Sequence, residues 1–151
     1  MKTNINGVFL CNPLCDIRLG TDFEKRDVEH LASLIVDHEG KGIISQNHWM
    51  NTASILISGL ILYALYSKTA EKQVSLLEIR KMLSPPDPGK AFESLWSEME
   101  TFHVDGKSHP VVSFTAKFMI KIPVEEAASI ISSAKNCLNY YIEKHQKIEV
   151  D

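Results

Sequence analysis

The residue types that most often do chemistry in proteins are dispersed along this sequence of 151 residues. No histidine forms a His-Glu-x-x-His motif or a close helical pair with a carboxylate ligand, so each is expected to be a surface or capping residue. The six are His30, His38, His48, His103, His109 and His145. Cys11, Cys15 and Cys137 are an odd count without C-x2-C spacing, which is typical of free thiols in a reducing compartment. The sequence predicts no catalytic residue and no metal site.

Two glycine-containing turns have a faint likeness to phosphate loops. Residues 39–42 read EGKG and residues 88–90 read PGK. Neither supplies the G-x4-G-K-[ST] pattern, whose amides and lysine hold nucleotide phosphates. We therefore expect no cofactor and no enzymatic activity in this chain.

Polar residues gather at two places that suit recognition better than catalysis. The first is one narrow edge of an otherwise apolar helical segment and holds Asn47, Asn51, Ser54 and Ser58. The second is the loop 103–109, where an Asp-Gly turn can project between two helices and presents His103, Asp105 and Lys107. A plainer interpretation makes the edge a solvated seam or a set of helix–helix hydrogen bonds.

Charge argues against a chain that depends on nucleic acid alone. The formal net charge is -3, whereas nucleic-acid-binding domains usually carry a basic excess that neutralises phosphates. Lys117 and Lys121 lie one helical turn apart and are the candidates for a local DNA contact. Two lysines are also what an ordinary solvated helix face carries.

The elements that must position these residues are helices, because a period of 3.6 residues dominates from about residue 21 to residue 146. We expect a single all-α domain, a compact bundle of about six helices. They cover residues 21–39, 46–67, 75–83, the segment around 92–102, 110–122, and the segment from Pro123 to about His145. The only strand we expect is a short one at Val8–Cys11.

Helix boundaries are marked by local signals. Thr21–Glu24 and Ser75–Glu78 both fit the capping box, in which a hydroxyl and a glutamate satisfy the first amides of a helix. Pro110 suits the first position of the fifth helix. The inner face of that helix is predicted to hold Val111, Phe114, Thr115, Phe118 and Ile122.

The helix at about 46–67 is predicted to be the centre of the bundle, because it is apolar on nearly all sides. Trp49, Leu56 and Leu60 should be buried, and Gly59 should let another helix approach closely. The uninterrupted apolar run covers only 14 residues, 53–66, whereas a membrane span needs roughly 20. No direct membrane contact is expected.

Four segments carry motifs of one known family. They read NPLCDIRLGTDFEKRDVEHLASLIVD at 12–37, HWMNTASILISGLILYALY at 48–66, SLLEIRKMLSPPDP at 75–88 and SHPVV at 108–112. In this order and spacing they resemble the all-α domain of type IV secretion coupling proteins, the TraG/TraD family. The resemblance covers about residues 8–145.

The resemblance implies a domain inserted in a larger, hexameric, DNA-translocase-like ATPase at the bacterial inner membrane. It implies a fold similar to the DNA-contacting domain of tyrosine recombinases, facing the cytoplasm. The phosphate loop and the acidic strand motif of the ATPase are absent here, as expected for an excised insert. Val8–Cys11 would then be the end of a strand of the ATPase core, and no catalytic residue is carried over.

The leading hypothesis is a substrate-recognition module that helps to select relaxase–DNA complexes or effector proteins for export. Its partners would be these secretion substrates or their adaptors, and the ATPase core of the same parent chain. The alternative is a helical domain that contacts the transferred DNA directly. A third interpretation is a free-standing cytosolic helical protein unrelated to secretion.

Overall fold

The computed structural model describes residues 2–5, 8–37, 48–67 and 74–145. These residues form six α-helices, one 3-10 turn and four short strands. In chain order they are β1 (Lys2–Ile5), β2 (Val8–Cys11), η1 (Pro13–Asp16), α1 (Glu24–Val36), α2 (His48–Ser67), α3 (Leu76–Met82), α4 (Pro88–Glu100), β3 (His103–Val104), β4 (Lys107–Ser108), α5 (Pro110–Lys121) and α6 (Val124–His145). The predicted all-α bundle is confirmed.

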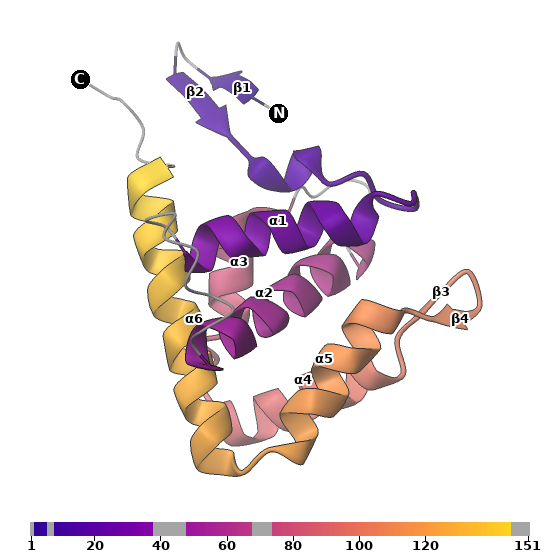
Figure 1. The fold of residues 1–151 in the computed structure, drawn as a ribbon. Helices are drawn as coiled ribbons and strands as arrows, with labels where there is room; N and C mark the ends of the chain where they lie inside the picture. Colours follow the sequence, from indigo (N-terminus) through magenta and orange to yellow (C-terminus); the bar gives the residue numbers. More distant parts are fainter. Residues whose placement is uncertain (1, 6–7, 38–47, 68–73, 146–151) are drawn as a thin grey trace.

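Helix α2 lies at the centre of the bundle, as its composition predicts. It packs against α1, α3, α5 and α6, and Figure 1 shows it between α1 and α5 with α6 crossing one end. Leu56, Ile57, Leu60, Ile61 and Leu62 have no exposed surface. Packing against four other helices requires apolar residues at most positions, which explains why the polar residues of α2 are confined to one narrow edge.

A close approach of α2 to α5 depends on Gly59. A Cβ atom built at Gly59 would lie 2.2 Å from the Thr115 hydroxyl oxygen and 2.5 Å from its Cβ. The Thr115 hydroxyl also donates a hydrogen bond of 3.1 Å to the carbonyl of Ile55 in α2. The glycine therefore fixes where α5 crosses α2, which confirms the close packing expected at this position.

Within the described residues, α2 is the one helix long and apolar enough to cross a membrane. The helix has 20 residues, which is the length that a membrane span requires, whereas its uninterrupted apolar run is shorter than that. However, 56% of its most apolar window is buried inside the protein. Such burial is what the core helix of a bundle also shows, so the length of α2 is weak support for a span.

The two predicted capping boxes do not form. Helix α1 begins at Glu24 with Phe23 at the N-cap, and the Thr21 hydroxyl accepts from the Phe23 amide instead. Ser75 is the N-cap of α3 but its side chain makes no capping hydrogen bond. The carboxylate of Glu24 has partners elsewhere in the fold, and these outcompete the local motif. By contrast, Pro110 does open α5, with the His109 side chain as its cap.

The strands are more numerous than the sequence predicted. The expected strand at Val8–Cys11 is β2, and it pairs with β1 in an antiparallel hairpin within this chain. Two further strands, β3 and β4, form a second hairpin around Asp105 and Gly106, both of which have positive φ. Strands β3 and β4 have two residues each, which is too short to show a period-2 pattern, so the sequence did not predict them.

Two aromatic residues predicted to be buried are not. Trp49 is 42% exposed at the start of α2, although Leu56 and Leu60 are buried as predicted. Phe114 is 57% exposed, because α5 turns Val112, Thr115, Ala116 and Met119 towards the core instead. Both aromatic side chains are therefore available at the surface.

Candidate functional site

An open groove lies where α1, α2 and the first turns of α5 meet. Its volume is about 710 Å³. The lining residues are Lys25 and Glu29 from α1, Asn51, Ser54, Ile55 and Ser58 from α2, and Pro110, Val111, Phe114 and Thr115 from α5. We call it the α1–α2–α5 groove, and it is the candidate functional site.

The chemistry of this groove is mixed. Asn51 presents an exposed amide, whereas Ser54 is half-buried and Ser58 is buried deeper along the same edge of α2. Across from them, the phenyl ring of Phe114 stands largely in solvent. On α1, Lys25 and Glu29 form an ion pair of 3.8 Å along one helical turn. The groove thus places an aromatic ring beside one amide, several hydroxyls and a charge pair.

The structure thus brings together part of the predicted recognition set. Asn51 and Ser54 lie in one groove, with Ser58 behind them. Asn47 falls outside the described residues. The polar edge of α2 therefore forms one wall of this groove.

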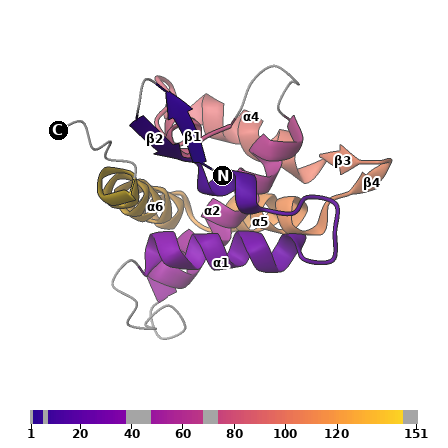
Figure 2. The same cartoon turned by 90° about the horizontal axis from the view of Figure 1, so that it is seen from above.

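The other predicted recognition residues lie apart from this groove. His103 is in β3, Lys107 is in β4, and Asp105 is at the turn between them. Figures 1 and 2 both show this hairpin projecting from the side of the molecule opposite α6. None of the three residues lines the groove.

Lys117 and Lys121 are both exposed on α5, and neither lines the groove. Phe114 and Phe118 stack with a centroid separation of 6.4 Å and an interplanar angle of 17° on the same helix. The sequence analysis predicted the two lysines as candidates for a DNA contact but placed both phenylalanines in the core. A run of apolar residues at most positions of α5 hid the fact that one aromatic ring faces outward.

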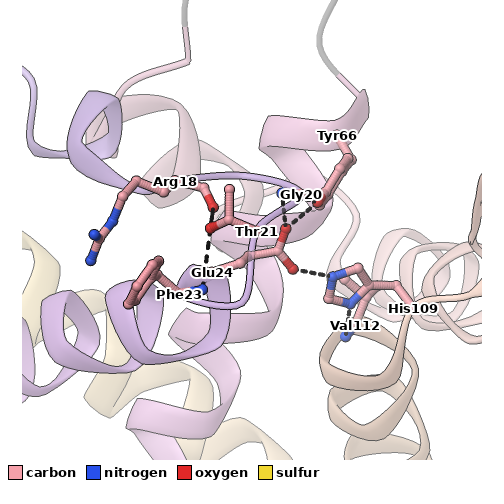
Figure 3. Close-up of polar contacts among 8 residues, drawn as sticks. All are labelled: Arg18, Gly20, Thr21, Phe23, Glu24, Tyr66, His109 and Val112. Carbon is pink, nitrogen blue, oxygen red and sulfur yellow. Dashed lines mark hydrogen bonds and ion pairs between the residues drawn. The ribbon is translucent and has the colours of Figure 1, made fainter.

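A polar cluster at one end of α1 joins groups from three parts of the described chain, and Figure 3 shows it. The Glu24 carboxylate accepts hydrogen bonds from the Gly20 amide at 2.9 Å and from the Tyr66 hydroxyl. Its second oxygen lies 2.6 Å from Nε2 of His109. One carboxylate therefore ties the loop before α1, the end of α2 and the start of α5 together.

The hydrogen bonds of His109 define its protonation pattern. Its Nδ1 is 3.4 Å from the amide of Val112, and an amide can only donate, so Nδ1 accepts. Nε2 then carries the proton and donates it towards Glu24. Sequence reasoning expected a surface or capping residue, and capping is correct. The partnership with Glu24 was missed, and only the His-Pro step at a helix start hinted at it.

The surroundings of Glu24 shift two pKa values. Burial alone raises the pKa of Glu24, but hydrogen bonds from Gly20, Tyr66 and His109 outweigh burial and lower it below its ordinary value of 4.5. Burial and the neighbouring Glu24 carboxylate raise the pKa of Tyr66 to about 12. Both shifts favour one ionised carboxylate held by several hydrogen-bond donors, which is a structural arrangement rather than a nucleophile with a base.

Nothing in the described part of the chain assembles a metal site. No group of three or more His, Cys, Asp or Glu side chains in residues 2–5, 8–37, 48–67 and 74–145 lies in an arrangement that could hold a metal ion.

Comparison with known proteins identifies the family of this chain. A family profile described as type IV secretory system conjugative DNA transfer matches residues 3–148. Two Escherichia coli proteins, both named conjugal transfer protein TraG, are 45% and 46% identical to the chain over 132 residues. Each alignment covers 86% of this chain and 20% of the relative, so the chain spans about a fifth of the length of these relatives. No solved structure matches the chain.

The match extends over nearly the whole chain and includes every helix described above. The resemblance inferred from the four sequence segments is therefore confirmed. This chain belongs to the type IV secretory system conjugative DNA transfer family, that of the TraG/TraD coupling proteins.

Proposed function

We propose that this domain is a substrate-recognition module of a coupling protein and helps to select relaxase–DNA complexes or effector proteins for export. Family membership supports a part in conjugative DNA transfer. The α1–α2–α5 groove supports recognition as that part, because it combines an exposed aromatic ring with polar groups that have room for a ligand.

The single observation that carries this proposal is the position of Phe114. Binding energy at protein interfaces is concentrated in a few large anchors surrounded by polar groups that fix register. Phe114 is 57% exposed at the edge of the groove, opposite the exposed amide of Asn51. An exposed phenyl ring costs solvation free energy in the isolated domain, and a partner that covers it recovers that free energy.

The proposal includes a parent protein of which this chain is one domain. The chain covers about a fifth of its TraG relatives, which supports an insert in a longer ATPase. In this proposal the domain faces the cytoplasm, the parent is tethered to the inner membrane, and the remaining contacts are with adaptors and with the ATPase core. His103, Asp105 and Lys107 stay candidates for a second contact, on the projecting hairpin.

Binding of the purified chain to the relaxase encoded with its parent tests the proposal. We expect Phe114→Ala and Asn51→Ala each to weaken binding by about tenfold or more in calorimetry, the effect of removing an anchor or its buried hydrogen bond. The matched controls are Leu34→Ala, an exposed apolar residue of α1, and Asn136→Ala, an exposed amide of α6. Neither lines the groove, so both should bind like the unmodified chain.

The proposal fails if all four variants bind the relaxase equally well. It also fails if neither the relaxase nor an effector protein binds at all while the chain is folded by circular dichroism. Equal weakening by the controls would indicate loss of folding rather than loss of a contact.

A second function, direct contact with transferred DNA, is favoured by one observation. Phe114 and Phe118 form a stacked aromatic pair, and Lys117 and Lys121 are exposed on the same helix. Aromatic faces that stack on bases beside cations that meet phosphates are the usual elements of single-strand binding. The net charge of -3 opposes it at longer range.

Salt dependence separates the two functions. If both lysines neutralise phosphates, the affinity for a single strand of about 20 nucleotides should fall roughly sevenfold between 50 and 200 mM salt. Replacing Lys117 and Lys121 by Ala should then remove most of that dependence. Strong, salt-sensitive DNA binding without relaxase binding would establish the second function in place of the first.

A further inference from the structure

A second groove lies on a different part of the molecule, between α4, the C-terminal end of α5 and the first half of α6. Its volume is about 740 Å³, and it shares no lining residue with the α1–α2–α5 groove. We call it the α4–α6 groove. Nothing in the proposed recognition role uses it.

The groove exists because its two walls belong to different parts of the bundle. Helix α4 packs mainly on α5, whereas α6 packs mainly on α1, α2 and α3. The chain turns sharply between Lys121 and Val124, so α5 ends where α6 begins. Ala127 and Ala128 then line the α6 wall with small side chains, which leaves the space open.

The interior of the groove is apolar. Trp96 and Met119 form part of its buried lining, and Phe92 stacks on Trp96 with ring centroids 5.6 Å apart. Ile120 is 49% exposed and Val124 is 81% exposed beside it. A contiguous apolar surface that is framed by polar residues marks an interaction site more often than it occurs by chance.

The charges around the groove are placed unequally. Glu93 and Glu100 stand on the α4 wall, and Lys135 stands on the α6 wall. The salt bridges of the described residues include none of these three side chains. A partner that places apolar side chains between the two walls would therefore gain most affinity from basic groups that lie next to α4.

We infer that the α4–α6 groove docks an amphipathic helical segment of a partner protein, with large apolar anchors flanked by lysine or arginine. A groove of this size admits a few large side chains, as in other helix-in-groove complexes. The inference does not depend on the α1–α2–α5 groove, since the two surfaces share no residue.

Trp96 supplies a direct readout of binding. The chain has two tryptophans, and Trp49 lies on α2 outside this groove, so Trp49→Phe leaves Trp96 as the sole emitter. The probe is an amphipathic peptide of about 14 residues, roughly 21 Å long as a helix, with Leu and Phe on one face and Lys beside them. We expect saturable change in Trp96 emission with this peptide. A peptide with Glu in place of Lys should bind several-fold more weakly.

Substitutions in the groove test the location and the charge preference. Ala128→Trp should fill the groove and weaken peptide binding by about tenfold, whereas Ser129→Trp, an exposed neighbour on α6 outside the groove, should not. The pair Glu93→Lys and Glu100→Lys should reverse the preference between the Lys and Glu peptides. Circular dichroism of each variant establishes that it is folded.

Several results would overturn the inference. One is equal binding of the Lys peptide, the Glu peptide and a scrambled peptide of the same composition. Another is self-association of the chain that Ala128→Trp abolishes, which would make a second copy the occupant. A third is peptide binding to the isolated chain but not to the full-length parent, which would make the parent itself the occupant.

Discussion

At the scale of single residues, Glu24 joins segments that are far apart in the sequence. Its carboxylate accepts from Gly20, Tyr66 and His109, which come from three separate parts of the chain. Hydrogen bonds from these groups stabilise the ionised form of the carboxylate, which is why the pKa of Glu24 falls despite burial. The cluster therefore fixes the start of α1 relative to α2 and α5.

The first prediction concerns pH. A carboxylate whose pKa is lowered by folding contributes stability above its unfolded pKa, and loses that contribution as pH falls through the folded value. For Glu24 the contribution should be complete well above pH 4.5 and should disappear at lower pH. We expect Glu24→Gln to lower the free energy of unfolding by about 1.5–3 kcal/mol at pH 7, the range for hydrogen bonds to a charged group.

Urea denaturation of both proteins at pH 7 and at pH 3.5 measures this difference. It should shrink at the lower pH, because the carboxylate is then closer to being protonated. Glu143→Gln, at an exposed position of α6, is the control and should have little effect at either pH. A difference that stays constant across this range would show that shape alone, and not ionisation, makes Glu24 important.

At the scale of elements, the crossing of α2 and α5 is the most constrained contact. Gly59 lets the Thr115 side chain lie directly against the α2 backbone, where its hydroxyl reaches the carbonyl of Ile55. The same crossing sets which side of α5 faces the solvent. The position of Phe114 in the α1–α2–α5 groove therefore depends on a glycine in another helix.

The second prediction is that Gly59→Ala destabilises the protein. Alanine is favoured over glycine within a helix by about 1 kcal/mol, but here its methyl group would lie 2.2 Å from the Thr115 oxygen. Forcing the helices apart should cost about 1–3 kcal/mol beyond that gain. Gly89→Ala in α4 meets no atom within 4 Å and should be neutral or slightly stabilising.

Thermal unfolding of both variants provides the comparison. An unchanged melting temperature for Gly59→Ala would mean that the crossing is looser than described.

At the scale of the whole molecule, one hydrophobic core supports two surface grooves. The core is a single cluster around α2 that draws residues from every helix. Helix α5 borders the α1–α2–α5 groove with its first turns and the α4–α6 groove with its last turn. Both grooves therefore depend on how firmly α5 is held on α2.

The third prediction concerns this core. Leu60 has no exposed surface in α2, and Leu60→Ala should lower the free energy of unfolding by about 2–5 kcal/mol, the range for large-to-small core substitutions. Leu77→Ala is the control, since Leu77 is 40% exposed on α3 and should cost far less. Chemical denaturation measures both. A loss below about 1 kcal/mol for Leu60→Ala would mean that α2 is peripheral to stability.

The sequence by itself determined the helices and the place of α2 among them. Proline at position 110, the proline-rich break after Leu83 and the helical period of apolar residues are local signals, and they predicted most helix boundaries to within a few residues. Gly59 likewise predicted a close contact between two helices. These features can be predicted from the sequence because each depends on residues within one or two helical turns along the chain.

Only the tertiary structure decided which surfaces are exposed. Helix α5 is apolar at most positions, so its sequence pattern does not distinguish the side that faces the core. The packing of Thr115 on Gly59 determines that side and leaves Phe114 exposed. Glu24 fitted a local capping box, yet two of its three partners, Tyr66 and His109, lie 42 and 85 residues away. Contacts between distant segments have no signature in local spacing, so the side-chain geometry of both grooves and of the Glu24 cluster arises only when the helices pack.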